Sequence, residues 1–209
     1  MAEMDIDIPD FDNVPGNWLC LDFTHTLANR YNPDRRELLH SYRDLLAWGL
    51  YMRLVTEEEV QQLLHVAEQR PREASTTTED AVRLREAIYR VFYAIVEDSE
   101  PRQDDMALLN AMLAQAMSHA RVEAKENGYS WSWDTSESVL NLILWHVVRS
   151  AADLLTSEKL RDVRACSAED CRWLFLDISK NHSRRWCDMQ TCGNQAKARR
   201  HYQRQRVQS

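Results

Sequence analysis

Apolar residues recur at helical spacing along most of this chain. The clearest stripe lies within 78–97 and consists of Leu84, Ile88, Val91, Phe92 and Ile95. These residues share one face of an α-helix, because most successive members are three or four positions apart. Similar periodicity predicts further helices over 17–30, 34–54, 56–71, 103–120 and 136–156. The pattern therefore predicts a mainly α fold with some β structure, in which the polar segment 71–78 is a loop.

Polar residues refine two of these helices. Thr56 and Glu59 have the spacing of a capping box and predict a helix start. Arg83, Arg85 and Arg90 lie off the apolar stripe of their helix. We expect them on a charged outer face, with anion binding as the alternative.

The helix predicted over 136–156 is apolar on most sides, which places it in the middle of a helical bundle. We expect its His146 to be a hydrogen-bonded core residue rather than a ligand. Just before it, 121–133 alternates with a period of two around Asn127-Gly128, which predicts a β-hairpin. Tyr129, Trp131 and Trp133 then share one face, which either covers a core helix or forms a stacking platform.

Charge is distributed unevenly along the 209 residues. The formal net charge is −7, but 161–209 carries eleven Lys/Arg against five Asp/Glu. That C-terminal stretch is therefore +6 and 1–160 is −13. Such asymmetry predicts a basic end that binds a polyanion, with a solvated basic tail as the alternative. No apolar run is long enough to span a bilayer, so we expect no membrane segment.

Four of the five cysteines fall near the C-terminus in two C-x4-C pairs. The members are Cys166 with Cys171 and Cys187 with Cys192. Two close pairs joined by a hairpin are typical of a structural site for one Zn²⁺, in which four protein ligands leave no open position. Disulfides or a redox dithiol are the alternatives. The acidic N-terminus has no signal-peptide pattern, so we expect a reducing cytoplasm, which favours the metal.

The residues around these cysteines predict a small treble-clef-like module. A strand is expected over 172–177, and a helix is expected to begin at about 192–194. Basic residues from the hairpin and this helix form a candidate nucleic-acid surface: Arg184, Arg185, Lys197, Arg199, Arg200 and Arg204. Cations on a zinc-held backbone suit contact with phosphates.

Two motifs carry a family resemblance. Cys192-Gly-Asn-Gln195 and the basic residues after it resemble the CGNR zinc finger, and 19–27 resembles the opening motif of the ABATE domain. The chain departs from the first motif at Gln195, where that family has Arg. The resemblance implies stress-induced transcription regulators that bind DNA. It divides the chain into an ABATE-like helical body, 1–160, which could sense a ligand, and a zinc module, 161–209.

The same resemblance draws attention to Asp22, His25 and Thr26 near the N-terminus. These polar residues lie beside an apolar stripe formed by Leu19, Phe23 and Leu27, which recur every four residues. They could line the pocket of a small-molecule effector. The alternative is a buried hydrogen-bonded cluster that orients the helix, because buried polar groups need partners.

Three functions follow from these features. The first is a transcription regulator whose zinc module binds DNA, with a homodimer expected if repeated half-sites are recognised. The second is a protein-interaction module, and the third is a thiol redox sensor that loses zinc on oxidation. We do not expect an enzyme, because the sequence has no Gly-rich phosphate loop, nucleophile motif or H-E-x-x-H.

Overall fold

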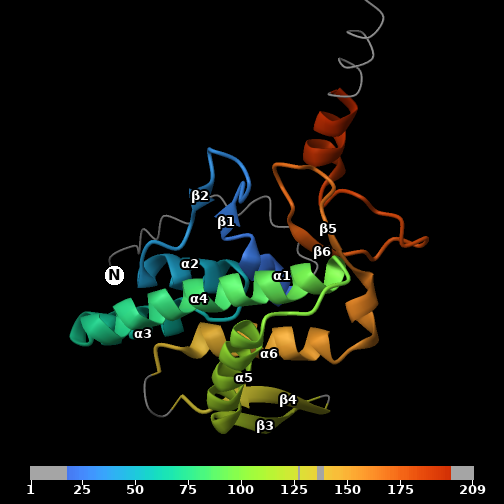
Figure 1. Cartoon of the computed structure of the whole chain (residues 1–209). Coiled ribbons are helices and arrows are strands. Elements are labelled where there is room, and N and C mark those ends of the chain that lie inside the picture. The colour runs from blue at the N-terminus through green and yellow to red at the C-terminus, as the bar shows by residue number, and fades with distance from the viewer. Residues whose placement is uncertain (1–17, 127, 136–138, 199–209) are drawn as a thin grey trace, which may run out of the picture.

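The computed structural model describes residues 18–126, 128–135 and 139–198. In this part the chain is mostly helical with small antiparallel β-hairpins, as predicted. Its longest helix is α4 (Pro71–Val96), which crosses the body in Figure 1. Helices α1 (Leu19–Thr24) and α6 (Leu142–Leu155) both contact α4 and each other. These three helices form the centre of the helical body.

The remaining helices complete the body around this centre. Helices α2 (Tyr42–Tyr51) and α3 (Glu57–Gln69) pack against α4 and each other, and α5 (Gln103–Ser118) packs between α4 and α6. The core is aromatic as well as aliphatic. Trp48 is fully buried, and its ring meets that of Phe23 edge-on with centroids 4.8 Å apart. Apolar burial of this kind is the main favourable term in folding.

The predicted cap of α3 is confirmed. The Thr56 hydroxyl accepts a hydrogen bond from the Glu59 backbone N–H, while the Glu59 carboxylate accepts one from the Thr56 N–H at 2.8 Å. Ser41 and Asp44 form the same reciprocal cap at the start of α2. This second cap explains why 34–54 is not one helix: the chain becomes helical only after Ser41.

Three other predicted boundaries are wrong. The first helix ends at Thr24 instead of reaching Arg30, because the Thr26 hydroxyl donates to the Phe23 carbonyl and the chain turns into β1 (Leu27–Ala28). The segment 71–78 is helical, not a loop. The last helix of the body begins at Leu142, and the expected starting residues 136–138 lie outside the described residues.

Besides the predicted hairpin, the body contains a two-residue antiparallel ladder between β1 and β2 (Arg36–Glu37). The predicted hairpin consists of β3 (Ala120–Lys125) and β4 (Gly128–Trp133). Trp133 packs against Trp145 of α6 and donates to Nδ1 of His146 at 3.3 Å. The aromatic face therefore covers a core helix at this end, whereas Tyr129 is 81% exposed.

The zinc module follows α6 through the 3-10 helix η1 (Glu158–Asp162). It contains the antiparallel strands β5 (Val163–Ala165) and β6 (Leu174–Leu176), then the π-helical turn η2 (Met189–Gly193). Both strands lie against α4, at the opposite end of the body from α3 (Figure 1). The module is thus packed onto the body rather than tethered to it.

Candidate metal centre

The four cysteines of the zinc module meet at one point. Cys166 and Cys171 bound the turn between β5 and β6, and Cys187 and Cys192 bound the turn that opens the C-terminal helix. Their sulfur atoms all lie within 4.8 Å of one another. The Sγ of Cys187 is 3.6 Å from that of Cys171 and 3.8 Å from that of Cys192.

These distances fit zinc. Four sulfurs placed tetrahedrally about 2.3 Å from a zinc ion are about 3.8 Å apart. The four cysteines are therefore able to coordinate one Zn²⁺. One pair lies in the turn of the β5–β6 hairpin and the other opens the C-terminal helix, which is a treble-clef-like arrangement. With four sulfur ligands the ion would hold the two loops together and would have no open position for substrate.

Thiols this close perturb one another's ionisation. Hydrogen bonds from the other three thiols lower the pKa of Cys166. The hydrogen bond with Cys166 is the largest cause that raises the pKa of Cys187, and the same holds for Cys171. Deprotonation of Cys166 therefore opposes deprotonation of Cys171 and Cys187. A dication bound by all four thiolates removes this conflict.

Backbone hydrogen bonds shape the first cysteine loop. The Cys166 N–H donates to the Trp173 carbonyl at 2.8 Å, which extends the β5–β6 ladder to the first sulfur ligand. The Ser167 N–H donates to the carbonyl of Arg185 at 2.8 Å. This second bond joins the first loop to the segment that enters the second loop, independently of the metal.

Two aspartates shape the second loop. Asp188 accepts hydrogen bonds from the Thr191 backbone and hydroxyl, and so caps the turn that contains Cys192. Asp177 is 1% exposed and accepts from Ser179 and from the Arg184 N–H. Burial raises the pKa of Asp177, but these hydrogen bonds outweigh it and the pKa is lowered overall. The loop before Cys187 is thus held by a buried carboxylate.

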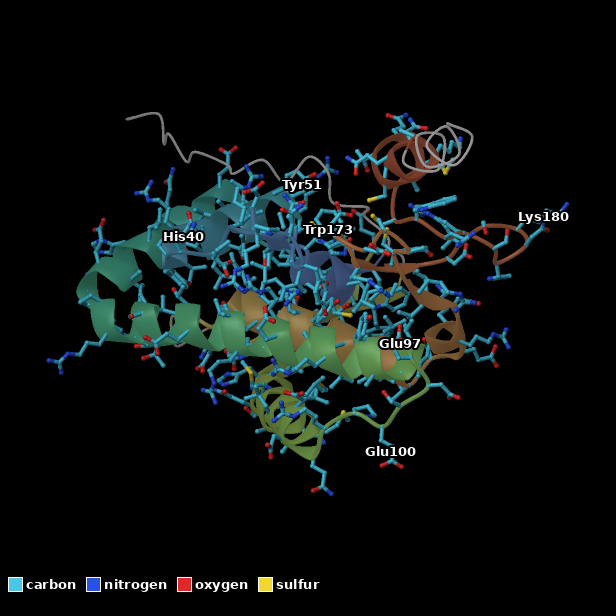
Figure 2. All side chains as sticks on the ribbon, turned by 45° about the horizontal axis from the view of Figure 1, so that its top comes forward. His40, Tyr51, Glu97, Glu100, Trp173 and Lys180 are labelled. Carbon is cyan, nitrogen blue, oxygen red and sulfur yellow. The ribbon has the colours of Figure 1, made fainter. Side chains whose placement is uncertain are left out.

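His25 and Trp173 join the zinc module to the body. Their rings are stacked with centroids 4.3 Å apart and 11° between the planes, and Nε2 of His25 is 2.8 Å from the Leu174 carbonyl. Since a carbonyl accepts, Nε2 carries the proton. Figure 2 shows Trp173 at this junction. Tyr89 of α4 adds a hydrogen bond from its hydroxyl to the Arg172 carbonyl at 3.1 Å.

The structure places Asp22, His25 and Thr26 in the interior, each at most 2% exposed. The Thr26 hydroxyl donates to a backbone carbonyl and accepts from Arg85 at 3.3 Å, and Nε2 of His25 donates to the Leu174 carbonyl at 2.8 Å. These contacts favour the buried polar cluster over the effector pocket.

The outer-face prediction is wrong for Arg85, which is 2% exposed. Its guanidinium makes two hydrogen bonds to the Glu37 carboxylate, at 2.6 and 2.7 Å, and one to Glu86 at 2.9 Å. Arg30 binds Glu86 as well and stacks over the Tyr89 ring at 4.0 Å. The β1–β2 ladder is therefore held on α4 by ion pairs in which the arginines are buried and the carboxylates are partly exposed.

Two family profiles match the chain, in the order that the motifs predicted. The first covers residues 17–158 and is the ABATE family, described as "Putative stress-induced transcription regulator". The chain belongs to the ABATE family. The second is the CGNR zinc finger, which covers 163–205. Both descriptions in this ABATE-family chain are regulatory or zinc-binding rather than enzymatic. A comparison with curated proteins gives no match.

The predicted basic residues are only partly described. Arg199, Arg200 and Arg204 lie outside the described residues. Lys197 and Arg185 are exposed. Arg184 instead binds the backbone carbonyls of Trp186 and Cys187, and stacks over the Phe175 ring at 4.9 Å. It braces the second cysteine loop, which makes it a weaker candidate for contact with a nucleic acid.

A cleft of about 230 Å³ opens beside the sulfurs. Its walls come from both parts of this ABATE-family chain: Asn29, Asp170, Cys171, Trp173, Cys187, Asp188, Thr191, Cys192 and Gln195. A second cavity of about 210 Å³ lies among α4, α5 and α6. No helix in the described ranges combines the length and apolar character needed to cross a membrane.

Proposed function

We propose that this protein is a transcription regulator that binds DNA through its zinc module. The observation that carries the proposal is the position of Cys192. This ligand lies in η2, and the chain continues from there directly into a helix over 194–198. Zinc held by Cys192 would therefore fix the direction of the basic C-terminal segment.

Charge supports the same proposal. From residue 178 onward the sequence has eight Lys/Arg and one acidic residue. Four thiolates and one Zn²⁺ add a net −2, so the module keeps a positive charge beside the acidic body. Lys180, at the tip of the loop before the second cysteine pair, points away from the body (Figure 2). Exposed cations on a fixed frame give salt-dependent affinity for phosphates.

The test is binding of zinc-loaded protein to a mixed-sequence duplex over a range of salt concentrations. Replacing Arg199, Arg200 and Arg204 with Ala should weaken binding. It should also reduce the slope of log K against log salt by about 1 for each phosphate that the variant no longer neutralises. A matched control replaces Arg70, Arg72 and Arg83 of the body, which removes the same charge.

Equal effects of the two triple variants would show that only overall charge matters. No binding at low salt by the zinc-loaded protein would overturn the proposal. Ligand sensing by the body, a homodimer and a protein-interaction role stay predictions from the sequence.

A further inference from the structure

The four sulfur ligands are not equally enclosed. Cys166 is fully buried and Cys187 is 3% exposed, whereas Cys171 and Cys192 are only partly buried. One cysteine of each C-x4-C pair is therefore accessible. The burial of a zinc-bound thiolate decides which reagents can reach it, because only a thiolate in contact with solvent can attack a dissolved electrophile.

The cleft beside the metal centre gives that access. Cys171, Cys187 and Cys192 line it, and Cys166 does not. Its volume, about 230 Å³, is several times the roughly 30 Å³ that a water molecule occupies in the liquid. A hydrogen peroxide molecule is close to two waters in size and fits. Asp170 and Asp188 also line the cleft, so a neutral oxidant is favoured over an anionic one.

A second sulfur lies within reach of each accessible one. The Sγ of Cys187 is 3.6 Å from that of Cys171 and 3.8 Å from that of Cys192. Sulfurs at this separation must approach to about 2.05 Å to form a disulfide, which small side-chain rotations can supply once the oxidised cysteine no longer binds the ion. Cys187 is thus placed to react with whichever neighbour is oxidised first.

We propose that the metal centre is a modification site for peroxides, at which Cys171 or Cys192 is oxidised first and Cys187 closes the disulfide. The thiolate sulfur attacks one peroxide oxygen, the O–O bond breaks, and a sulfenic acid and water form after uptake of a proton. The Cys187 thiolate then attacks the sulfenic sulfur, and the hydroxyl of the sulfenic acid leaves as water with a second proton. Two thiolates are oxidised and one peroxide is reduced.

Loss of two thiolate ligands would release the zinc, because the remaining pair cannot hold it as four do. Oxidation at Cys192 or Cys187 would also free the turn that precedes the basic segment. Any effect of this on nucleic-acid affinity rests on the function proposed above. The oxidation itself does not, so the experiment is done without nucleic acid.

The first measurement treats the zinc-loaded full chain with hydrogen peroxide and follows free zinc with a colorimetric chelator. The disulfides formed at partial release are then mapped after trypsin digestion. The expected result is loss of one zinc per chain, with early disulfides that pair Cys187 with Cys171 or Cys192. Cys20 serves as the internal control, since it is fully buried in the core and should stay reduced. Zinc retained under peroxide, or an early disulfide containing Cys166, would overturn the proposal.

A second measurement tests the cleft as the route. Gln195 lines the cleft, whereas Gln190 is exposed nearby on η2 and does not. Gln195→Trp should fill the opening and slow zinc release several-fold at unchanged zinc content, and Gln190→Trp should release zinc at the parent rate. Equal rates in all three proteins would show that the oxidant does not enter through the cleft.

Discussion

His25 is a buried residue at the contact between the body and the zinc module. Its ring stacks on Trp173 and is hydrogen-bonded to the Leu174 carbonyl. Burial is the largest cause that lowers the pKa of His25, to about 3. The imidazole is therefore neutral in the folded protein wherever the fold is stable. In the unfolded chain it would titrate near 6.5.

This difference predicts a pH dependence. Below about pH 6.5 the unfolded chain binds a proton at His25 that the folded chain does not. The free energy of unfolding therefore decreases as the pH is lowered. Between pH 6.5 and 5 the loss from this residue should be about 1.6 kcal/mol, because the unfolded His25 is already half protonated at pH 6.5. When urea unfolding is measured with zinc in excess, the free energy of unfolding should decrease more steeply with decreasing pH for the parent than for His25→Gln. Protons also compete with zinc for the thiolates, but equally in both proteins. As a control, His40→Gln changes an exposed histidine and should show the same pH dependence of stability as the parent. A pH dependence in His25→Gln equal to that of the parent would contradict the prediction.

Some features of individual residues could be predicted from the sequence, and others could not. The metal centre was predictable because the two C-x4-C pairs encode it locally. The stack of His25 on Trp173 was not predictable, because the two residues are far apart in the chain and no local pattern at either one indicates the contact. Arg85 was misplaced for a similar reason: its partner Glu37 lies 48 positions away, and helical periodicity alone puts such an arginine on the surface.

At the scale of elements, periodicity found the helices but misplaced several ends. The start of α4 was missed because 71–78 is polar and rich in threonine. In the structure Pro71 is the first residue of the helix, where its missing N–H costs nothing, and the hydroxyls of Thr76 and Thr78 bond to carbonyls one turn earlier. Composition suggests a loop here, whereas the terminal proline and these backbone contacts accommodate a helix.

The packing of α2 on α6 leads to a prediction about Gly49. A Cβ at this position would lie 2.4 Å from Cδ1 and 2.9 Å from Cγ1 of Ile143, which is fully buried in α6. Alanine is favoured over glycine in a helix by about 1 kcal/mol, but overpacking a core costs about 1–3 kcal/mol. Gly49→Ala should therefore lower the free energy of unfolding, as measured by urea denaturation.

The substitution Ile143→Val removes Cδ1 and should relieve the close contact between this atom and the Cβ introduced by Gly49→Ala. By itself it should cost about 0.5–1.5 kcal/mol. The double variant should then be more stable than the sum of the two single effects predicts, because the residues are in contact. A Gly49→Ala protein at least as stable as the parent would show that α2 and α6 can separate slightly without cost.

At the scale of the whole molecule, two apolar clusters are joined through β6. Leu174 and Leu176 belong to the large core of the helical body, whereas Phe175 belongs to a small cluster with the cysteines. This alternation follows from the period of two in a strand. One face of β6 is therefore anchored in the body without help from the metal, and the other face depends on the cysteine loops.

Removal of zinc should therefore open the loops and spare the body. Binding to a structural site contributes about 10–16 kcal/mol in isolated zinc-finger peptides, and the small cluster has few apolar residues to replace it. After chelation, the far-UV helical signal should be largely retained. Trypsin should cut first after Lys180, Arg184 or Arg185, and renewed zinc should restore protection. Collapse of the helical signal with zinc loss would mean that the body depends on the metal, and unchanged proteolysis would mean that the loops do not. Either result would contradict the conclusion that one face of β6 is held by the body and the other by the zinc-bound cysteine loops.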